Sequence, residues 1–173
     1  MSLVPPEDYG WDMTEQPPAI TISHPPPALT RIANPVLMLL LRTPLLGATR
    51  QRFMTVSFTG RKTGRHISLP LSAHLVDDIL YALAAAKWKY NFRDGAPAQV
   101  LYGGKTTTMR GELIEDTALI ANLYTRLSAS YGVKHAEQSM GLAFRNHELP
   151  SRDDFAEAVQ RLHLRAIRFT PAT

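Results

Sequence analysis

The sequence predicts an α+β domain built on a small closed or split β-barrel, mainly antiparallel, with about six strands and flanking helices. Short segments rich in β-branched and aromatic residues follow one another between residues 53 and 114, separated by turn residues. Two segments with apolar residues at helical spacing come next, and an alternating segment ends the pattern. Hairpin-connected strands followed by helices and a last strand are typical of this class.

The size and composition suit one soluble globular domain. The chain has 173 residues, 45% hydrophobic and 20% charged. It has no cysteine, which excludes disulfides, thiolate metal sites and cysteine nucleophiles. The net charge of +4 is compatible with nucleic acid, an anionic membrane surface, an anionic cofactor or no charged partner at all. We find no secretory signal or membrane-spanning segment and expect a cytoplasmic protein.

Residues 1–30 form a proline-rich N-terminal arm, and residues 31–173 form the barrel domain. The arm holds seven of the thirteen prolines. Because proline lacks an N–H and fixes φ, this stretch is neither a long helix nor a central strand. We expect an extended arm, partly disordered or wrapped on the body, with Tyr9 and Trp11 as anchors.

A short apolar helix is predicted over Pro35–Leu46. Asn34 is its candidate N-cap, and the helix should break near Thr43, because a residue before proline avoids the α region. One interpretation is a helix packed on the body or on a second subunit of a homodimer. The other is a helix that lies on a membrane surface, which would make the protein peripheral at the inner membrane. The arginines that flank it are Arg31, Arg42, Arg50 and Arg52.

The first five strands are predicted at residues 53–58, 66–76, 79–86, 98–102 and 105–114. Pro70 lies inside the second of them and favours an edge position or a bulge. Gly103-Gly104 is a tight hairpin turn between the last two.

The C-terminal third is predicted to hold two capped helices and one strand. Asp116 can cap a helix over residues 117–131, and Ser151 opens a capping-box variant at the start of a helix that ends near Arg161. Residues 132–150 are ambiguous. Residues 164–169 alternate apolar and cationic side chains and form a half-buried strand.

The turn at residues 59–65 (TGRKTGR) is the most informative feature. Its glycines permit positive φ and let a ligand approach the backbone, and consecutive amides there can form an anion site. The turn lacks the pattern of a Walker loop or a Rossmann fingerprint. It therefore indicates either a solvated hairpin turn or a site for a phosphorylated or acidic tail. The turn residues predicted to bind are Arg61, Lys62, Thr63, Gly64 and Arg65.

A second candidate segment covers residues 84–93 (AAAKWKYNFR). Small residues at a strand end leave room for a flat ring, and Lys87 and Trp88 could add charge and a wall. The alternative is that Trp88 and Phe92, at i and i+4, anchor a helix in the core.

Other chemistries have little support in the sequence. The six histidines lack zinc-site spacing, so we predict no metal. There is no G-x-S-x-G elbow and no acid–base carboxylate pair, which leaves room for a cofactor that does the chemistry itself. Basic residues without interleaved aromatics argue against nucleic acid.

The run Phe58–Arg65 followed by a proline-containing strand resembles the signature of the deazaflavin-dependent nitroreductase family. The element Trp88-Lys89-Tyr90-Asn91, followed by Gly-Ala-Pro and a strand with a Gly-Gly turn, is similar to the family pattern as well. The resemblance covers roughly residues 34–115. Here Ala84 runs almost directly into Lys87, where members with the fuller pattern have a longer Gly-rich insertion.

The resemblance implies a flavin-binding split barrel that binds coenzyme F-420, a deazaflavin, with FMN as the alternative cofactor. It implies hydride transfer to a small conjugated acceptor such as a quinone or nitro compound. The basic turn would hold the cofactor tail, with Tyr124 and Tyr131 as candidate acceptor contacts. The residues that would bracket or support the ring are Ala85, Ala86, Lys87, Trp88 and Asn91. A non-catalytic cofactor or lipophile carrier on the same barrel is the alternative function.

Overall fold

The computed structural model describes residues 16–23 and 35–173. The predicted anchors Tyr9 and Trp11, the predicted cap Asn34 and the flanking Arg31 lie outside these ranges.

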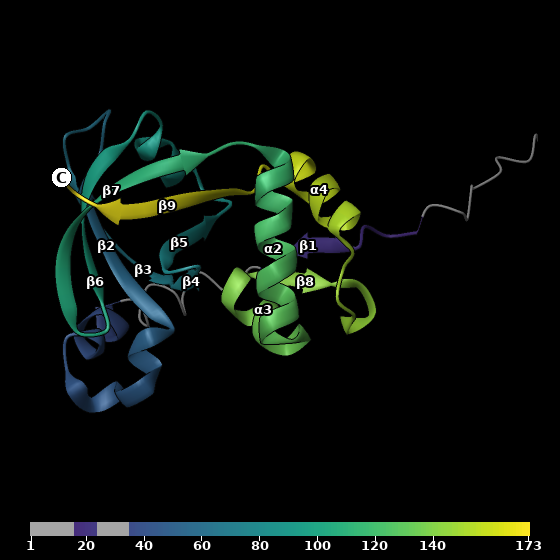
Figure 1. Cartoon of the computed structure of the whole chain (residues 1–173), viewed down its shortest axis with the longest axis horizontal. Coiled ribbons are helices and arrows are strands. Elements are labelled where there is room, and N and C mark those ends of the chain that lie inside the picture. The colour runs from purple at the N-terminus through teal and green to yellow at the C-terminus, as the bar shows by residue number, and fades with distance from the viewer. Residues whose placement is uncertain (1–15, 24–34) are drawn as a thin grey trace, which may run out of the picture.

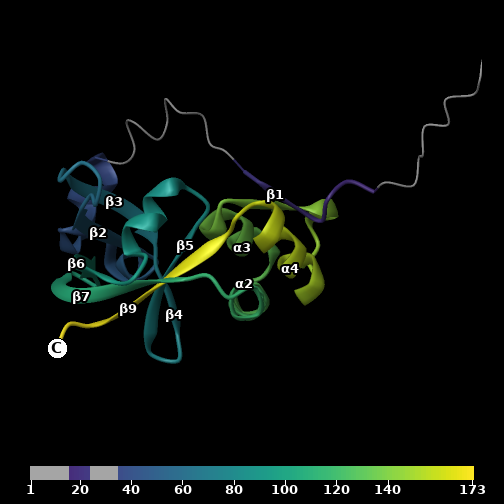
Figure 2. The same cartoon turned by 90° about the horizontal axis from the view of Figure 1, so that it is seen from above.

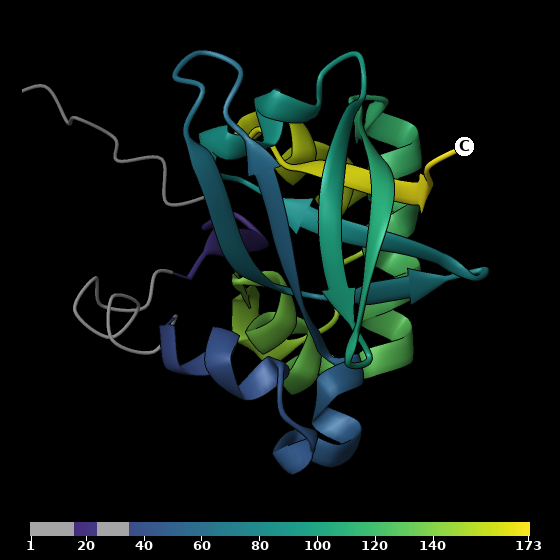
Figure 3. The same ribbon diagram turned by 90° about the vertical axis from the view of Figure 1, so that its left-hand side faces the viewer.

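A curled antiparallel sheet of seven strands forms a half-barrel, as Figures 1 and 3 show. Its strand order is β3-β2-β6-β7-β9-β5-β4, and every neighbouring pair is antiparallel. The α+β split-barrel prediction is confirmed. The strands are β2 Phe53–Thr59, β3 His66–Ser72, β4 His74–Val76, β5 Ile79–Ala84, β6 Ala96–Tyr102, β7 Lys105–Ile114 and β9 Arg165–Pro171.

The prediction of one continuous strand over residues 66–76 is wrong. The chain leaves the pairing with β2 after Ser72 and joins β5 at His74, so β3 and β4 form the two opposite edges of the sheet. At the break, the Ala73 N–H donates to the carbonyl of Arg52 at 2.9 Å. The edge position predicted for Pro70 is confirmed, since β3 is paired on one side only.

Three helices form a layer beside the barrel (Figures 1 and 2). They are α2 Thr117–Tyr131, α3 Val133–Met140 and α4 Arg152–Arg161. Both predicted caps are confirmed. The Asp116 carboxylate accepts the Leu119 N–H at 2.8 Å, and Ser151 and Asp154 form a reciprocal capping box.

The helical layer includes a two-stranded sheet that the sequence did not indicate. Strand β1 Ile20–Ile22 pairs antiparallel with β8 Leu142–Phe144, which follows α3 and precedes the 3₁₀ helix η3 Arg145–His147. Ile20 is fully buried there. This part of the N-terminal arm is therefore held on the body.

Three apolar clusters stabilise the described part of the molecule, and the smallest lies between α2 and β9. The first fills the barrel, where Phe92 packs edge-on against Phe58 and Phe169. The second lies between the helices and the small sheet, with Phe155 stacked on Tyr124. Aromatic pairs of these geometries add to the stabilisation from buried area.

A short helix over residues 35–41 and the 3₁₀ helix η1 Pro44–Gln51 lie at one end of the barrel (Figure 3). The predicted break at Thr43 is confirmed, because the α-helix ends before it. Within the two described ranges, each helix is too short or too polar to cross a membrane.

Candidate functional site

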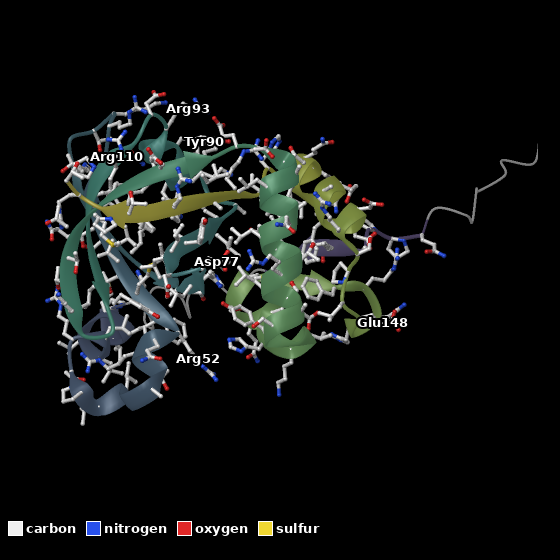
Figure 4. All side chains as sticks on the ribbon, viewed as in Figure 1. Arg52, Asp77, Tyr90, Arg93, Arg110 and Glu148 are labelled. Carbon is white, nitrogen blue, oxygen red and sulfur yellow. The ribbon has the colours of Figure 1, made fainter. Side chains whose placement is uncertain are left out.

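A cavity of about 970 Å³ opens at the other end of the barrel, between the loop 60–65 and the 3₁₀ helix η2 Lys87–Phe92. Figure 4 shows two of its lining residues, Tyr90 and Arg93, at the upper edge of the molecule. Its lining residues are Gly60, Arg61, Lys62, Thr63, Ile67, Lys87, Trp88, Tyr90, Asn91 and Arg93. Pockets of roughly 300–1,000 Å³ are typical of small-molecule and cofactor sites.

The loop 60–65 is a compact turn closed by its own backbone. The Gly60 N–H donates to the Arg65 carbonyl at 2.8 Å, and the Gly64 N–H donates to the Gly60 carbonyl at 2.9 Å. Gly64 has φ +66°, which glycine adopts without steric cost. The local sequence therefore closes the turn and leaves the side chains of Lys62 and Thr63 beside the cavity.

Helix η2 is fixed to the body by two buried side chains. Phe92 is fully buried in the barrel core. Lys89 is 1% exposed, and its Nζ donates to the carbonyls of Ala85, at 2.8 Å, and His163. Burial, and then the charge of Arg165, lower the pKa of Lys89 below its usual range. The same helix presents Lys87, Trp88 and Asn91 to the cavity because Lys89 and Phe92 point inward.

Asn91 connects the two walls of the cavity. Its Oδ1 accepts the backbone N–H of Arg61 at 2.9 Å, and its Nδ2 donates to the Trp88 carbonyl at 2.8 Å. The Arg61 guanidinium adds a second link, because it donates to the Arg93 carbonyl at 2.8 Å and lies 3.8 Å from the Asp94 carboxylate. Arg61 thus positions the loop as well as adding charge.

The cavity combines positive charge with an aromatic wall. Lys62 and Lys87 are exposed, and neither makes an ion pair or side-chain hydrogen bond within the part of the chain that the structure describes. Trp88 is half-buried against Phe58 and Phe92, with ring centroids 6.2 and 6.3 Å away. Of the described residues, those that line the cavity include no histidine and no carboxylate. Such a site attracts an anion and offers an apolar face for a ring.

Six of the ten predicted cofactor-binding residues line this cavity, and four do not. Ala85 and Ala86 are exposed just before η2, and Gly64 and Arg65 complete the turn without lining the cavity. The six that the fold brings together are Arg61, Lys62, Thr63, Lys87, Trp88 and Asn91.

Four lining residues are not among the ten predicted to bind a cofactor. They are Gly60, Ile67, Tyr90 and Arg93. Tyr90 and Arg93 belong to the segment 84–93, and the Arg93 guanidinium lies 5.0 Å from the centre of the Tyr90 ring. The sequence signal for these two residues is an aromatic side chain, Tyr90, with a cation three residues away on either side.

The two tyrosines proposed as acceptor contacts lie away from the cavity lining. Tyr124 is 1% exposed in the helical core, and burial raises its pKa above the usual range. The Tyr131 hydroxyl lies 2.8 Å from Nδ1 of the buried His74, and its ring stacks on His135. Both tyrosines therefore have structural partners in the helical layer.

A smaller cavity of about 320 Å³ lies between the β4–β5 and β6–β7 hairpins and the end of β9. Most of its lining is apolar, including Leu75, Leu80 and Met109, with Lys105 and Asp78 among the polar residues. Among the described residues, no three His, Asp or Glu side chains are grouped so that they could hold a metal ion.

No family model and no curated protein match the sequence. Among solved structures, the chain is similar to the conserved hypothetical protein Rv2991 from Mycobacterium tuberculosis, with a TM-score of 0.42 and 13% sequence identity. That match covers 92% of this chain and 87% of the other.

Proposed function

We propose that this protein is an oxidoreductase that binds a reduced deazaflavin, with FMN as the alternative cofactor, and transfers hydride to a small conjugated acceptor. The observation that carries the proposal is the cavity itself, whose lining combines two exposed lysines, Lys62 and Lys87, with a half-buried tryptophan. The similarity of residues 58–65 and 88–91 to the deazaflavin-dependent nitroreductase pattern supports a deazaflavin as the cofactor.

The residues present fit such a group in charge and in shape. Lys62 and Thr63 border the cavity on the loop side, where a phosphorylated or acidic tail would meet an ammonium and a hydroxyl. Trp88 and Ile67 supply apolar surface for a flat ring. Because the cavity approaches 1,000 Å³, it has room for a ring and a tail together.

The protein's own part in the reaction would be to bind, orient and exclude water. When bound, a reduced deazaflavin supplies the hydride. Asn91 and Arg61 hold the two walls at a fixed separation, so that the ring is placed before an acceptor arrives. A lining without histidine or carboxylate offers no general acid or base of those types, which is compatible with chemistry supplied by the cofactor.

Binding is tested by titrating the purified full chain with coenzyme F-420 and, in parallel, with FMN, monitored by fluorescence. We expect one of the two to bind, and the double variant Lys62→Ala/Lys87→Ala to bind it at least tenfold more weakly, about 1.4 kcal/mol. Lys134→Ala, which removes an exposed lysine on α3, is the matched control and should bind normally. Binding of neither cofactor would contradict the proposal.

A non-catalytic cofactor or lipophile carrier is the second candidate function. The same absence of histidine and carboxylate from the lining favours it, since binding alone needs no proton transfer. The reductase and the carrier are distinguished by adding a quinone or a nitro compound to the protein with bound reduced cofactor. Absorbance then measures whether the cofactor is oxidised. Turnover supports the reductase, and tight binding without turnover across the acceptors supports the carrier.

A further inference from the structure

We propose that the end of the barrel formed by residues 35–52 docks on an anionic lipid surface. This docking surface comprises the helix over residues 35–41, the turn at 42–43, η1 and Arg52. It lies at the opposite end of the barrel from the cavity. The proposal therefore does not depend on the proposed function.

The docking surface exposes large aliphatic side chains. Val36 is 54% exposed, Leu39 is 65% exposed and Leu45 is 80% exposed. A helix on a protein surface usually turns polar residues to solvent and apolar residues to the core. Here Leu41 is buried and supplies the apolar contact with the body. The exposed leucines therefore do not contribute to the core.

The charge around these leucines has one sign. Residues 35–52 include three arginines and no aspartate or glutamate. Arg42 and Arg52 are exposed on the docking surface itself. Exposed leucines in a segment whose charged residues are all arginines match the interface of a bilayer that carries anionic headgroups.

The turn of the β6–β7 hairpin extends the same cationic surface. The Arg50 guanidinium lies against Gly104, where an added Cβ would overlap it. Lys105 follows that turn at the start of β7. Two segments distant in sequence thus bring cations to the same end of the barrel, which favours a broad anionic partner over a single small anion.

The direction of β2 separates the docking surface from the cavity. This strand begins at Phe53, directly after Arg52, and ends at Thr59, directly before the loop 60–65. Arg52 accordingly lies at the lower side of the molecule, and Tyr90 and Arg93 at the upper side (Figure 4). A docked molecule would keep the mouth of its cavity in water.

The test is co-sedimentation of the full chain with phosphatidylcholine vesicles, with and without phosphatidylglycerol. We expect at least about tenfold stronger binding to the anionic vesicles, weakening as salt is raised, because exposed charges are screened. The double variant Leu39→Ser/Leu45→Ser should lose most of this binding. Leu119→Ser/Leu149→Ser, which changes two exposed leucines outside the docking surface, should keep it.

The charge component is tested separately with Arg42→Gln/Arg52→Gln, against Arg152→Gln on α4 as control. Both arginines are exposed, so the fold should persist, and circular dichroism melting verifies this. We expect the double variant to bind anionic vesicles several-fold more weakly and Arg152→Gln to bind normally. Equal binding to neutral and anionic vesicles, or binding unaffected by both double variants, would overturn the proposal.

A second copy of the chain is the rival occupant of this surface. Sedimentation velocity of the same variants distinguishes it. A dimer that Leu39→Ser/Leu45→Ser dissociates, together with no vesicle binding, would refute the lipid proposal. Since neither readout requires a bound cofactor, failure of the reductase proposal would leave this result unaffected, and the reverse also holds.

Discussion

Asn91 accepts the backbone N–H of Arg61 at 2.9 Å and thereby joins helix η2 to the loop on the facing wall of the cavity. Its amide nitrogen donates to the Trp88 carbonyl within the same helix, so one side chain holds both the loop and the helix turn. Because the contact is to the backbone of Arg61, it fixes where the loop lies whatever side chains the loop carries.

Asn91→Ala should therefore weaken ligand binding in the cavity while the barrel stays folded. Loss of two hydrogen bonds of about 1 kcal/mol each would free the loop and lower affinity by roughly ten- to thirtyfold. Calorimetric titration measures the affinity, and hydrogen exchange at the Arg61 amide measures the freed loop. Gln99→Ala, which removes a surface hydrogen bond to Thr108, is the control. Unchanged exchange at Arg61 would count against this role.

Lys89→Met should destabilise the protein by about 1–3 kcal/mol. The substitution keeps an unbranched apolar chain but leaves the carbonyls of Ala85 and His163 without their buried donor. Urea unfolding gives the change in the free energy of unfolding, with Lys134→Met as the exposed control. An increase in stability would mean that the cost of burying the ammonium exceeds the value of its two hydrogen bonds.

Gly111→Ala should destabilise the barrel and disturb the cavity together. A Cβ at this position would lie 2.5 Å from Cδ1 of Phe92 and 3.0 Å from Cε1 of Phe169. Overpacking of this kind costs about 1–3 kcal/mol, and Phe92 can yield only by moving η2. Thermal unfolding and cofactor titration are the measurements. The double variant Gly111→Ala/Phe92→Leu should lose less stability than the two single variants lose in sum.

His74 should make stability fall on mild acidification. It is 1% exposed on β4, faces the Tyr131 hydroxyl and lies in the field of His135, which follows on α3. Burial first, and the charge of His135 second, lower its pKa from 6.5 to about 4. The folded state thus binds this proton less readily than the unfolded state does.

The direction of the pH dependence follows from this difference in proton affinity between the folded and unfolded states. His74 has no effect on the pH dependence above about 6.5, and the protein loses up to about 3 kcal/mol through this group as the pH falls towards 4. The difference in unfolding free energy between the wild type and His74→Gln, measured from pH 7.5 to 4, isolates the contribution. The curve of the variant should be flatter. Parallel curves would show that the pKa of His74 is the same in the folded and unfolded states.

The parts of the fold that the sequence predicts well depend on local signals. Asp116 and Ser151 each cap a helix through a backbone N–H three residues further on, and the mixed apolar and cationic side chains that predict β9 lie within that strand. The break at Ala73 could not be predicted in this way, because it depends on residues 66–72 pairing with β2 while His74 pairs with β5. Strand β1 could not be predicted because its three residues lie between prolines and pair with β8, which is distant in sequence.

The same contrast between local and long-range signals applies to the candidate site. Glycines and cations in one short turn indicate an anion site without reference to the rest of the chain. That Arg61 is held by Asn91 and Arg93, while Lys62 and Lys87 face the cavity, depends on two segments about thirty residues apart coming together. Tyr124 was a candidate only by residue type, and its packing on Phe155 could not be seen in the sequence.

The proline in β3 has a consequence for how these molecules behave at high concentration. An unpaired strand edge is a template for another chain, and β3 offers seven residues of such edge. Pro70 sits opposite Thr55 near the middle of this edge, and a proline in an edge strand turns its missing donor to the open side. An incoming strand would find its ladder interrupted there, so the open seam of the barrel is guarded against edge-to-edge aggregation.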